Sequence, residues 1–353
     1  MLFFLFLQLW DVLVVTHLVA RKKIKKEILI LLCFPFIGSG QACDSLLLES
    51  ITNPGPFVVN TINENSGIRN GPDYNGATIF YPNNSSVLSS IIMVPGFSLT
   101  ELTIQNWGYF FASHGIITMT IGTNSLTDTP MQRRDALLDA IISLKNENQR
   151  LASPLYGQID TLSIAVGGFS QGGGGAQLVP ALDPSIKAVV SLYPWLDNPT
   201  TSDLNHSVPV IIISGQLDII APPLIHANVH YSLTPNTTNK LKYEVAAGSH
   251  DPISGPNGGN GEIGIRVISW LQNFLLNDSC YCPILLLSPN TSSSYTTNVL
   301  CNNTNVNVSF LIPNSQKKLL KIIDIFGRKT TKNKLIIFYI YDDGTVDRKI
   351  IFE

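Results

Sequence analysis

Charged side chains are scarce in this sequence, because Asp, Glu, Lys and Arg together make up only 14% of its 353 residues. The formal net charge is −2, so there is no surplus of positive charge to hold a nucleic-acid backbone. We therefore expect no nucleic-acid partner. The sequence also shows no internal repeat. Its hydrophobic fraction of 44% is ordinary for a globular protein, and its length allows one large core with accessory segments.

The sequence also lacks a metal-binding pattern, because the spacing of its five cysteines does not fit a metal site. Cys280 and Cys282 are separated by one residue, which is too tight for a zinc knuckle, and no histidine lies nearby in the sequence. Cys33 falls in a segment that we expect to be removed, which leaves Cys43, Cys280, Cys282 and Cys301. An even number of cysteines in an exported protein favours disulfides, with free structural thiols as the alternative.

The first 42 residues have the layout of a targeting segment. A basic region is followed by the apolar run Ile28 to Ile37 and by small residues that end at Ala42. The basic residues are Lys22, Lys23, Lys25 and Lys26. This order predicts a secretory signal peptide, with lipidation of Cys43 as a weaker alternative. The apolar residues 1–20 could form a membrane helix by length, but a translation start placed too early explains them more simply.

The remainder of the chain changes character near residue 310. Residues 43–309 carry 9 Lys or Arg against 18 Asp or Glu, whereas residues 310–353 carry 9 against 5. This change in the sign of the net charge suggests two modules. We predict a main domain over residues 43–285, its C-terminal end and a linker over residues 286–309, and a small domain over residues 310–353.

Predicted strands alternate with predicted helices through the main domain. Short apolar runs bounded by turn residues predict strands, and helical spacing of apolar residues predicts helices. The strands are residues 77–81, 89–94, 116–121, 162–166, 188–193, 208–214 and 240–245. The helices are residues 106–113, 131–146, 170 onward and 262–276. This alternation predicts an α/β fold with a mainly parallel central sheet and helices on both faces.

Two further segments differ from this pattern: residues 43–75 are polar and turn-rich, and residues 283–309, rich in Ser, Thr and Asn, resemble a loop and linker. The small domain is predicted to contain strands at residues 317–326, 334–341 and 349–352, with Asp343-Gly344 as a hairpin signal. We expect it to be β-sandwich-like.

Gly168-Phe169-Ser170-Gln171-Gly172 fits the pattern G-x-S-x-G, between a predicted strand and a predicted helix. In that context the serine lies on a strained turn that exposes its hydroxyl as a nucleophile. The glycines continue to Gly175, although each costs about 1 kcal/mol in a helix relative to alanine. Close backbone approach at the turn is the expected reason. A chance glycine-rich turn is the alternative.

Two later residues can complete a catalytic triad with Ser170, because in this fold the acid and then the histidine follow the serine along the chain. Asp218 follows the strand at residues 208–214, and His250 follows the strand at residues 240–245. Functional residues gather at such strand ends in parallel sheets. Asp251 is adjacent to His250 and is expected to be a loop residue.

Three other histidines are poor candidates for the general base. His206 precedes the strand of Asp218, whereas His226 and His230 lie in an apparent helix, where surface positions are expected.

An oxyanion hole needs two backbone N–H groups. Gln171 supplies one, and Phe97 in Val94-Pro95-Gly96-Phe97 is the candidate for the other, with an ordinary turn as the alternative reading.

These segments together resemble the polyesterase–lipase–cutinase family, and most closely its poly(ethylene terephthalate) hydrolases. The matching blocks are Pro95-Gly96-Phe97, Ala112-Ser113-His114-Gly115, Gly122-Thr123-Asn124-Ser125, Ser153-Pro154-Leu155-Tyr156-Gly157, Gly168 to Gly175, Tyr193-Pro194-Trp195, Asp218-Ile219-Ile220-Ala221-Pro222 and Gly248-Ser249-His250. The resemblance implies an α/β-hydrolase fold, the triad Ser170, Asp218 and His250, and oxyanion donors at Phe97 and Gln171. It implies substrate contacts from Phe97, Phe169, Gln171, Trp195 and Ile220.

The sequence departs from the family at several positions. Phe169 stands where His or Trp is usual, and Gln171 stands where Met is usual, which places a polar side chain in the cleft. Gly215 and Pro252 occupy positions where polyester specialists often have a disulfide between two site loops. The resemblance also implies a Cys282–Cys301 disulfide, and parity then pairs Cys43 with Cys280.

The C-terminal segment resembles a type IX secretion sorting domain. The resemblance rests on residues 318–328 and 342–349. It implies export to the cell exterior or surface and a partner in the type IX secretion machinery. A carbohydrate- or polymer-binding β module is the alternative, although Phe338, Tyr339 and Tyr341 fall in an apparent strand core.

The expected function is therefore hydrolysis of esters by a secreted, monomeric serine hydrolase that needs no cofactor or metal. Polyester is the expected substrate, and a small-ester or lipid esterase is the rival enzyme. A surface adhesin on an inactive hydrolase scaffold is the non-enzymatic rival.

Overall fold

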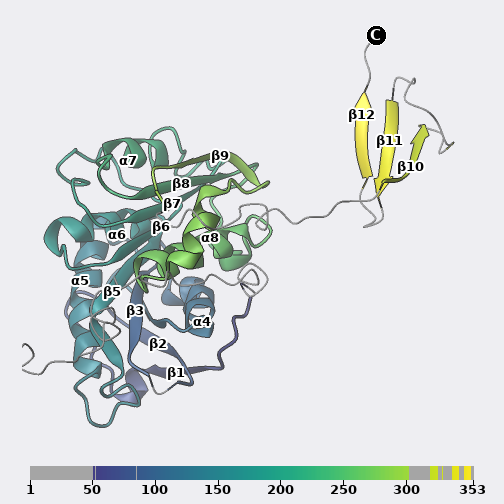
Figure 1. Ribbon diagram of the computed structural model, residues 1–353. Coiled ribbons are helices and arrows are strands. Elements are labelled where there is room, and N and C mark those ends of the chain that lie inside the picture. Colours follow the sequence, from purple (N-terminus) through teal and green to yellow (C-terminus); the bar gives the residue numbers. More distant parts are fainter. Residues whose placement is uncertain are drawn as a thin grey trace, which may run out of the picture. The chain divides into compact units, whose positions relative to one another are not determined.

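A computed structural model describes residues 51, 53–84, 86–301, 319–324, 328, 336–341 and 346–350. Within them lie a nine-stranded sheet and a separate three-stranded sheet (Figure 1). The predicted signal region, with its alternative membrane helix, and Cys43 lie outside the described residues. In the part of the chain that is described, no helix has the length and apolar character that a membrane span requires.

The nine-stranded sheet has the order β1-β2-β4-β3-β5-β6-β7-β8-β9. Its strands are β1 (Val59–Asn63), β2 (Ala77–Pro82), β3 (Leu88–Val94), β4 (Ile117–Ile121), β5 (Ile159–Phe169), β6 (Ala188–Leu192), β7 (Val210–Gly215), β8 (Lys240–Val245) and β9 (Ser292–Thr297). The pairings from β4 through β8 are parallel, whereas β1-β2, β2-β4 and β8-β9 are antiparallel. The C-terminal ends of five neighbouring strands, β3, β5, β6, β7 and β8, therefore meet at one edge of the sheet.

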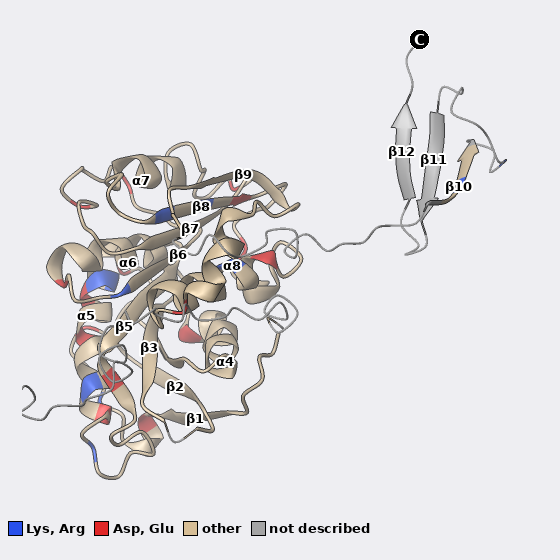
Figure 2. Ribbon diagram, viewed as in Figure 1, with Lys and Arg blue, Asp and Glu red and all other residues tan. Residues whose placement is uncertain are grey.

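Helices cover both faces of this sheet (Figure 1). On one face lie α4 (Gln105–Ser113) and α8 (Glu262–Phe274), and on the other lie α5 (Pro130–Glu147), α6 (Gln171–Leu182) and α7 (Ala227–Leu233). Each face has its own core, with Trp107 and Trp270 in the first and Leu137 and Val179 in the second. Figure 2 shows how thinly charged residues are spread over these elements. The predicted fold class, a mainly parallel sheet between helices as in α/β-hydrolases, is confirmed.

The start of α5 shows how local sequence sets an element boundary. The Thr129 hydroxyl accepts a hydrogen bond from the Gln132 backbone N–H, and the Gln132 side chain accepts one from the Thr129 N–H. This reciprocal pair satisfies two N–H groups that a helix start leaves unpaired. Pro130 follows at the first helical position, where its missing N–H costs nothing. The helix therefore begins at Pro130, one residue before the predicted start.

Strand β9 corrects the prediction that residues 283–309 form a loop and linker. Residues Ser292–Thr297 pair antiparallel with β8, and the Tyr295 ring lies 5.9 Å from that of Tyr243. Its polar residues are suited to the edge of a sheet, where one side faces water. Likewise, β1 (Val59–Asn63) lies within residues 43–75, which were expected to be turn-rich.

Disulfides tie the end of this domain together. Cys282 and Cys301 are joined, which is the pairing that the resemblance implied. Cys280 is also disulfide-bonded. Because Cys43 lies outside the described residues, its pairing with Cys280 stays a prediction.

The second sheet comprises β10 (Leu319–Asp324), β11 (Ile336–Tyr341) and β12 (Val346–Ile350), all paired antiparallel. The third strand begins three residues before the predicted strand at 349–352. Asp343-Gly344, the predicted hairpin turn between β11 and β12, lies outside the described residues. One sheet is present in the described part of residues 310–353, so the sandwich-like arrangement stays a prediction.

Candidate active site

The residues predicted to form the site follow successive parallel strands at one edge of the sheet. Each one lies within a few residues of the strand's C-terminal end. In sheet order they are Phe97 after β3, Ser170 after β5, Trp195 after β6, Asp218 after β7 and His250 after β8. This edge is where parallel sheets place their ligand sites.

Ser170 occupies a strained turn between β5 and α6. Its φ of 54° and ψ of −120° are unfavourable for a residue with a side chain. Three backbone hydrogen bonds hold it there: its N–H donates to Leu192 at 2.8 Å, and its carbonyl accepts from Gly174 at 3.0 Å and Trp195 at 2.9 Å. The surrounding backbone therefore maintains the strained conformation that presents the hydroxyl.

The glycines around Ser170 allow backbones to meet. A Cβ on Gly168 would lie 2.4 Å from the carbonyl carbon of Gly172, and a Cβ on Gly172 would lie 2.4 Å from the Val94 carbonyl oxygen. A Cβ on Gly96 would lie 2.7 Å from the Cβ of Ser170. The loop after β3 is therefore in direct contact with the serine turn. Close approach, the predicted reason for the glycine run, is the one that the structure supports.

Asp218 and His250 are hydrogen-bonded to each other. His250 Nδ1 lies 2.6 Å from Asp218 Oδ2, and the other carboxylate oxygen accepts the backbone N–H groups of Ile220 at 2.9 Å and Ala221 at 2.8 Å. Burial acts to raise the pKa of Asp218, but the hydrogen bonds from His250, Ala221 and Ile220 outweigh it, and the pKa is lowered. An ionised Asp218 favours the proton on Nδ1 and leaves Nε2 of a neutral His250 as a base.

Phe169 and Tyr193 hold the imidazole of His250. Their ring centroids lie 4.9 Å and 6.1 Å from that of His250. Because Phe169 directly precedes Ser170, this contact brings His250 to the serine turn. Phe169 is only 3% exposed and its ring packs against the imidazole, so its contact with substrate stays a prediction. Asp251 accepts the backbone N–H groups of its own loop, as expected of a loop residue.

Hydrogen bonds join the two loops that carry Asp218 and His250. Leu217 N–H donates to the Gly248 carbonyl at 2.7 Å, and Ala247 N–H donates to the Gln216 side chain at 2.9 Å. A Cβ on Gly215 would lie 2.6 Å from the Gly248 carbonyl oxygen. The loops are therefore tied by one backbone–backbone and one backbone–side-chain hydrogen bond, at a point where the sequence has no cysteine.

The two candidate oxyanion donors are available for a ligand. Among the residues that the structure describes, the backbone N–H groups of Phe97 and Gln171 have no hydrogen-bond acceptor. The Gly96 carbonyl accepts from Leu99 N–H at 3.2 Å, which turns the next N–H, that of Phe97, the opposite way. Two free N–H groups beside a serine can stabilise a negatively charged oxygen.

Apolar side chains are exposed around these groups. Phe97 and Ile220 are 49% and 59% exposed, and Trp195 is partly buried with its ring 5.6 Å from that of His226. His226 is a residue that sequence reasoning missed. It was expected at the surface but is 3% exposed, because the start of α7 packs behind Trp195.

His230 was also expected at the surface but is fully buried. Its Nδ1 lies 3.1 Å from the Gln177 side-chain nitrogen on α6, and its Nε2 lies 3.3 Å from the Leu196 carbonyl oxygen. Burial lowers the pKa of His230 to about 4, so the ring is neutral at physiological pH. A polar side chain on the inner face of α7 is tolerated here because both nitrogens have partners.

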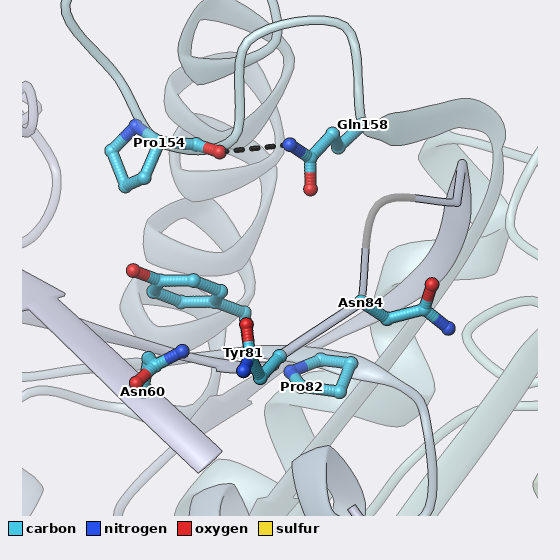
Figure 3. A pocket seen from close by; sticks show the side chains of 7 residues that line it. Asn60, Tyr81, Pro82, Asn84, Pro154 and Gln158 are labelled. Carbon is cyan, nitrogen blue, oxygen red and sulfur yellow. Dashed lines mark hydrogen bonds between the residues drawn. The ribbon is translucent and has the colours of Figure 1, made fainter. Parts of the chain in front are cut away.

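A hollow of about 580 Å³ lies away from the predicted site. It is lined by Asn60, Tyr81, Pro82, Asn83, Asn84, Pro154 and Gln158 (Figure 3). Gln158 directly precedes β5, at the end of that strand opposite to Ser170. None of its lining residues belongs to the predicted site. In the described part of the chain, no three His, Cys, Asp or Glu side chains gather closely enough to hold a metal ion.

Comparison with known proteins gives the family. A model of the PET hydrolase-like family matches residues 40–303. Cutinase 1 of Thermobifida cellulosilytica is 33% identical over 255 residues, which cover 72% of this chain and 92% of that protein. A cutinase of Thermobifida fusca (strain YX) is also 33% identical, over 72% of this chain and 80% of its own length. Bis(hydroxyethyl) terephthalate hydrolase of Streptomyces coelicolor is 32% identical over 65% of this chain and 72% of its own. The chain therefore belongs to the PET hydrolase-like family and is a carboxylic ester hydrolase of the cutinase and PET hydrolase type.

Proposed function

We propose that this hydrolase cleaves esters by acyl transfer through Ser170, with His250 as general base and Asp218 as the residue that orients the base. The observation that carries the proposal is the 2.6 Å contact between His250 and Asp218, made beside the strained turn of Ser170. An acid, a base and a nucleophile on neighbouring strand ends are the parts that this chemistry needs.

The reaction has two steps. His250 Nε2 accepts the proton of the Ser170 hydroxyl while the serine oxygen bonds to the ester carbonyl carbon. The N–H groups of Phe97 and Gln171 donate to the oxyanion that forms. The carbon–oxygen bond to the alcohol then breaks, and the alcohol leaves with the proton held by His250. Water repeats the attack, its proton passes through His250 to the departing serine oxygen, and the acid is released.

Polyester is the substrate that we propose. The exposed Phe97 and Ile220, together with Trp195, offer apolar and aromatic surface beside Ser170. One relative is named for hydrolysis of bis(hydroxyethyl) terephthalate, a small aromatic diester. We expect slow cleavage, because Gln171 places an amide in this surface. Product release from an amorphous poly(ethylene terephthalate) film tests this. No terephthalate product alongside rapid cleavage of p-nitrophenyl butyrate would favour the small-ester alternative.

Two readouts test the triad. A p-nitrophenyl phosphonate should label the peptide that contains Ser170, which peptide mass spectrometry detects. The rate of ester cleavage should rise with pH through the range in which histidines lose their proton, because His250 acts as the neutral base. Asp218 should add no step there, since its pKa is lowered. A label on another residue, or a rate that is flat from about pH 5 to 9, would contradict the assignment.

We further propose that the enzyme is exported as a monomer, with residues 1–42 as signal and residues 310–353 as a type IX sorting domain. The disulfide between Cys282 and Cys301 supports an oxidising destination. The separate antiparallel sheet β10-β11-β12 supports a distinct C-terminal module. Removing residues 310–353 in a host with type IX machinery should keep the enzyme inside the cell. Unchanged export with weaker adsorption to polymer would favour the binding-module alternative.

A further inference from the structure

Arg133 is a buried cation that the proposed reaction does not use. It lies in the first turn of α5 and is 0% exposed. It shares the buried face of that helix with Leu137 and Ala140, at the spacing of an apolar stripe. Burial lowers the pKa of Arg133 to about 10, with Asp128 acting in the opposite direction, so the guanidinium stays charged at neutral pH. A charge in such a place needs several partners.

The partners of Arg133 are backbone carbonyls. Nε donates to Asp128 at 3.0 Å, Nη1 donates to Pro95 at 2.8 Å, and Nη2 donates to Leu126 at 3.1 Å. Pro95 lies in the loop after β3, and the other two carbonyls lie in the loop after β4. The planar guanidinium thus joins two separate loops at fixed angles, which a flexible ammonium does less well.

The loop held in this way carries the candidate oxyanion donor. Its first carbonyl, that of Pro95, binds Arg133, and its Ser98 N–H donates at 2.8 Å to the same Leu126 carbonyl that Arg133 holds. Within the loop, Leu99 N–H donates to the Gly96 carbonyl. The Phe97 N–H lies between these anchored groups and has no acceptor among the described residues.

The start of α5 also packs against α6, the helix that begins with the second donor, Gln171. A Cβ on Gly175 of α6 would lie 2.6 Å from the Pro130 carbonyl oxygen and 3.1 Å from Arg133 Cβ. A Cβ on Gly172 would lie 2.5 Å from the Pro95 carbonyl oxygen. The start of α5, the start of α6 and the loop of Phe97 therefore meet without room for a methyl group, and Arg133 lies at their junction.

We propose that Arg133 is a positioning residue that fixes the Phe97 N–H relative to the Gln171 N–H and so sets the geometry of the oxyanion hole. The inference rests on the proposed acyl-transfer function. In this proposal Arg133 does not contact the substrate and acts through the loop of Phe97. Removing one oxyanion donor costs about 10²- to 10³-fold in kcat, so a displaced donor should cost part of that.

The test compares Arg133→Lys and Arg133→Gln with wild-type enzyme. On p-nitrophenyl butyrate we expect kcat to fall about 10- to 100-fold while KM changes less than about 3-fold, because the oxyanion exists only in the transition state. An alkyl boronic acid, whose tetrahedral adduct on Ser170 places an oxygen in the hole, should bind more weakly by a similar factor. Arg266→Lys on α8 is the matched control, since Arg266 is 6% exposed and pairs with Glu262. It should lower Tm without weakening boronic acid binding.

The outcomes separate the two proposals. Wild-type enzyme that is not labelled at Ser170 would remove the proposed function itself. Active wild-type enzyme with folded Arg133 variants that keep kcat and boronic acid affinity would overturn only the role of Arg133. Equal losses in the Arg266 variant would also overturn it, as would failure of both Arg133 variants to fold, because the residue would then serve folding in general.

Discussion

Replacing Gln171 by methionine should stabilise this protein. The side-chain Oε1 of Gln171 is buried and has no hydrogen-bond donor among the described residues. An unpaired buried amide costs about 1–3 kcal/mol in protein mutational data. Methionine has similar length and no group that requires a partner. Because the rest of the Gln171 side chain is partly exposed, we expect a gain near the lower end, about 1 kcal/mol in the free energy of unfolding. That corresponds to a rise in Tm of about 2–4 °C for a domain of this size.

Gln132→Met is the matched control. The Gln132 side chain accepts from the backbone N–H and hydroxyl of Thr129 and is exposed, so its loss should lower stability by about 1 kcal/mol. Thermal and urea unfolding measure both variants. Gln171→Met should also raise the ratio of polyester release to p-nitrophenyl butyrate cleavage, because it removes an amide from the apolar surface. A Gln171→Met variant that is less stable than wild type, or that moves in the same direction as Gln132→Met, would refute the reasoning.

Three further predictions concern the cleft, acid stability and the C-terminal segment. Trp195→Ala should lower the polyester-to-short-ester ratio about 2- to 10-fold, since an aromatic contact contributes about 0.5–1.5 kcal/mol; an unchanged ratio on film and p-nitrophenyl butyrate would exclude the contact. Burial lowers the pKa of His206 and His230 to about 4, so below pH 6.5 the unfolded chain binds protons that the folded chain does not. The free energy of unfolding should therefore fall between about pH 6.5 and 4, by about 3 kcal/mol for each histidine, and urea unfolding that is independent of pH in this window would contradict it. A chain of residues 43–309 should still hydrolyse soluble esters, because every proposed site residue precedes residue 251; folded protein without activity would show that the C-terminal segment is needed.

Much of the central sheet could be predicted, because its strands are short segments rich in apolar and β-branched residues and bounded by turn residues. Residues 240–245 were predicted as a strand, and β8 has the same bounds. The serine turn was predicted from G-x-S-x-G, whose glycines are required by contacts that any residue with a Cβ would block. The local pattern was sufficient in both cases, although the contacts that require the glycines at the serine turn come from Val94 and Pro95, which are distant in the sequence.

Features set by distant contacts could not be predicted. Strand β9 is polar, and only its pairing with β8 makes it a strand. His230 and Arg133 are polar groups on helix faces, and backbone carbonyls far away in the chain partner both. A signal did exist for Arg133, because it continues the apolar stripe of Leu137 and Ala140. The resemblance implied a substrate contact for Phe169, but it did not show that the ring packs against Tyr193 and His250.

The most direct test of the proposed mechanism is the turnover of p-nitrophenyl butyrate by Ser170→Ala, with Ser249→Ala as control. Ser249 is an exposed serine beside His250 to which we assign no role. Ser170→Ala should fold with an unchanged circular dichroism spectrum and lose activity by about 10⁴-fold or more, because only an oxyanion hole without its nucleophile remains. Ser249→Ala should keep near-normal turnover. Folded Ser170→Ala with near-normal turnover would contradict the assignment of Ser170 as the nucleophile.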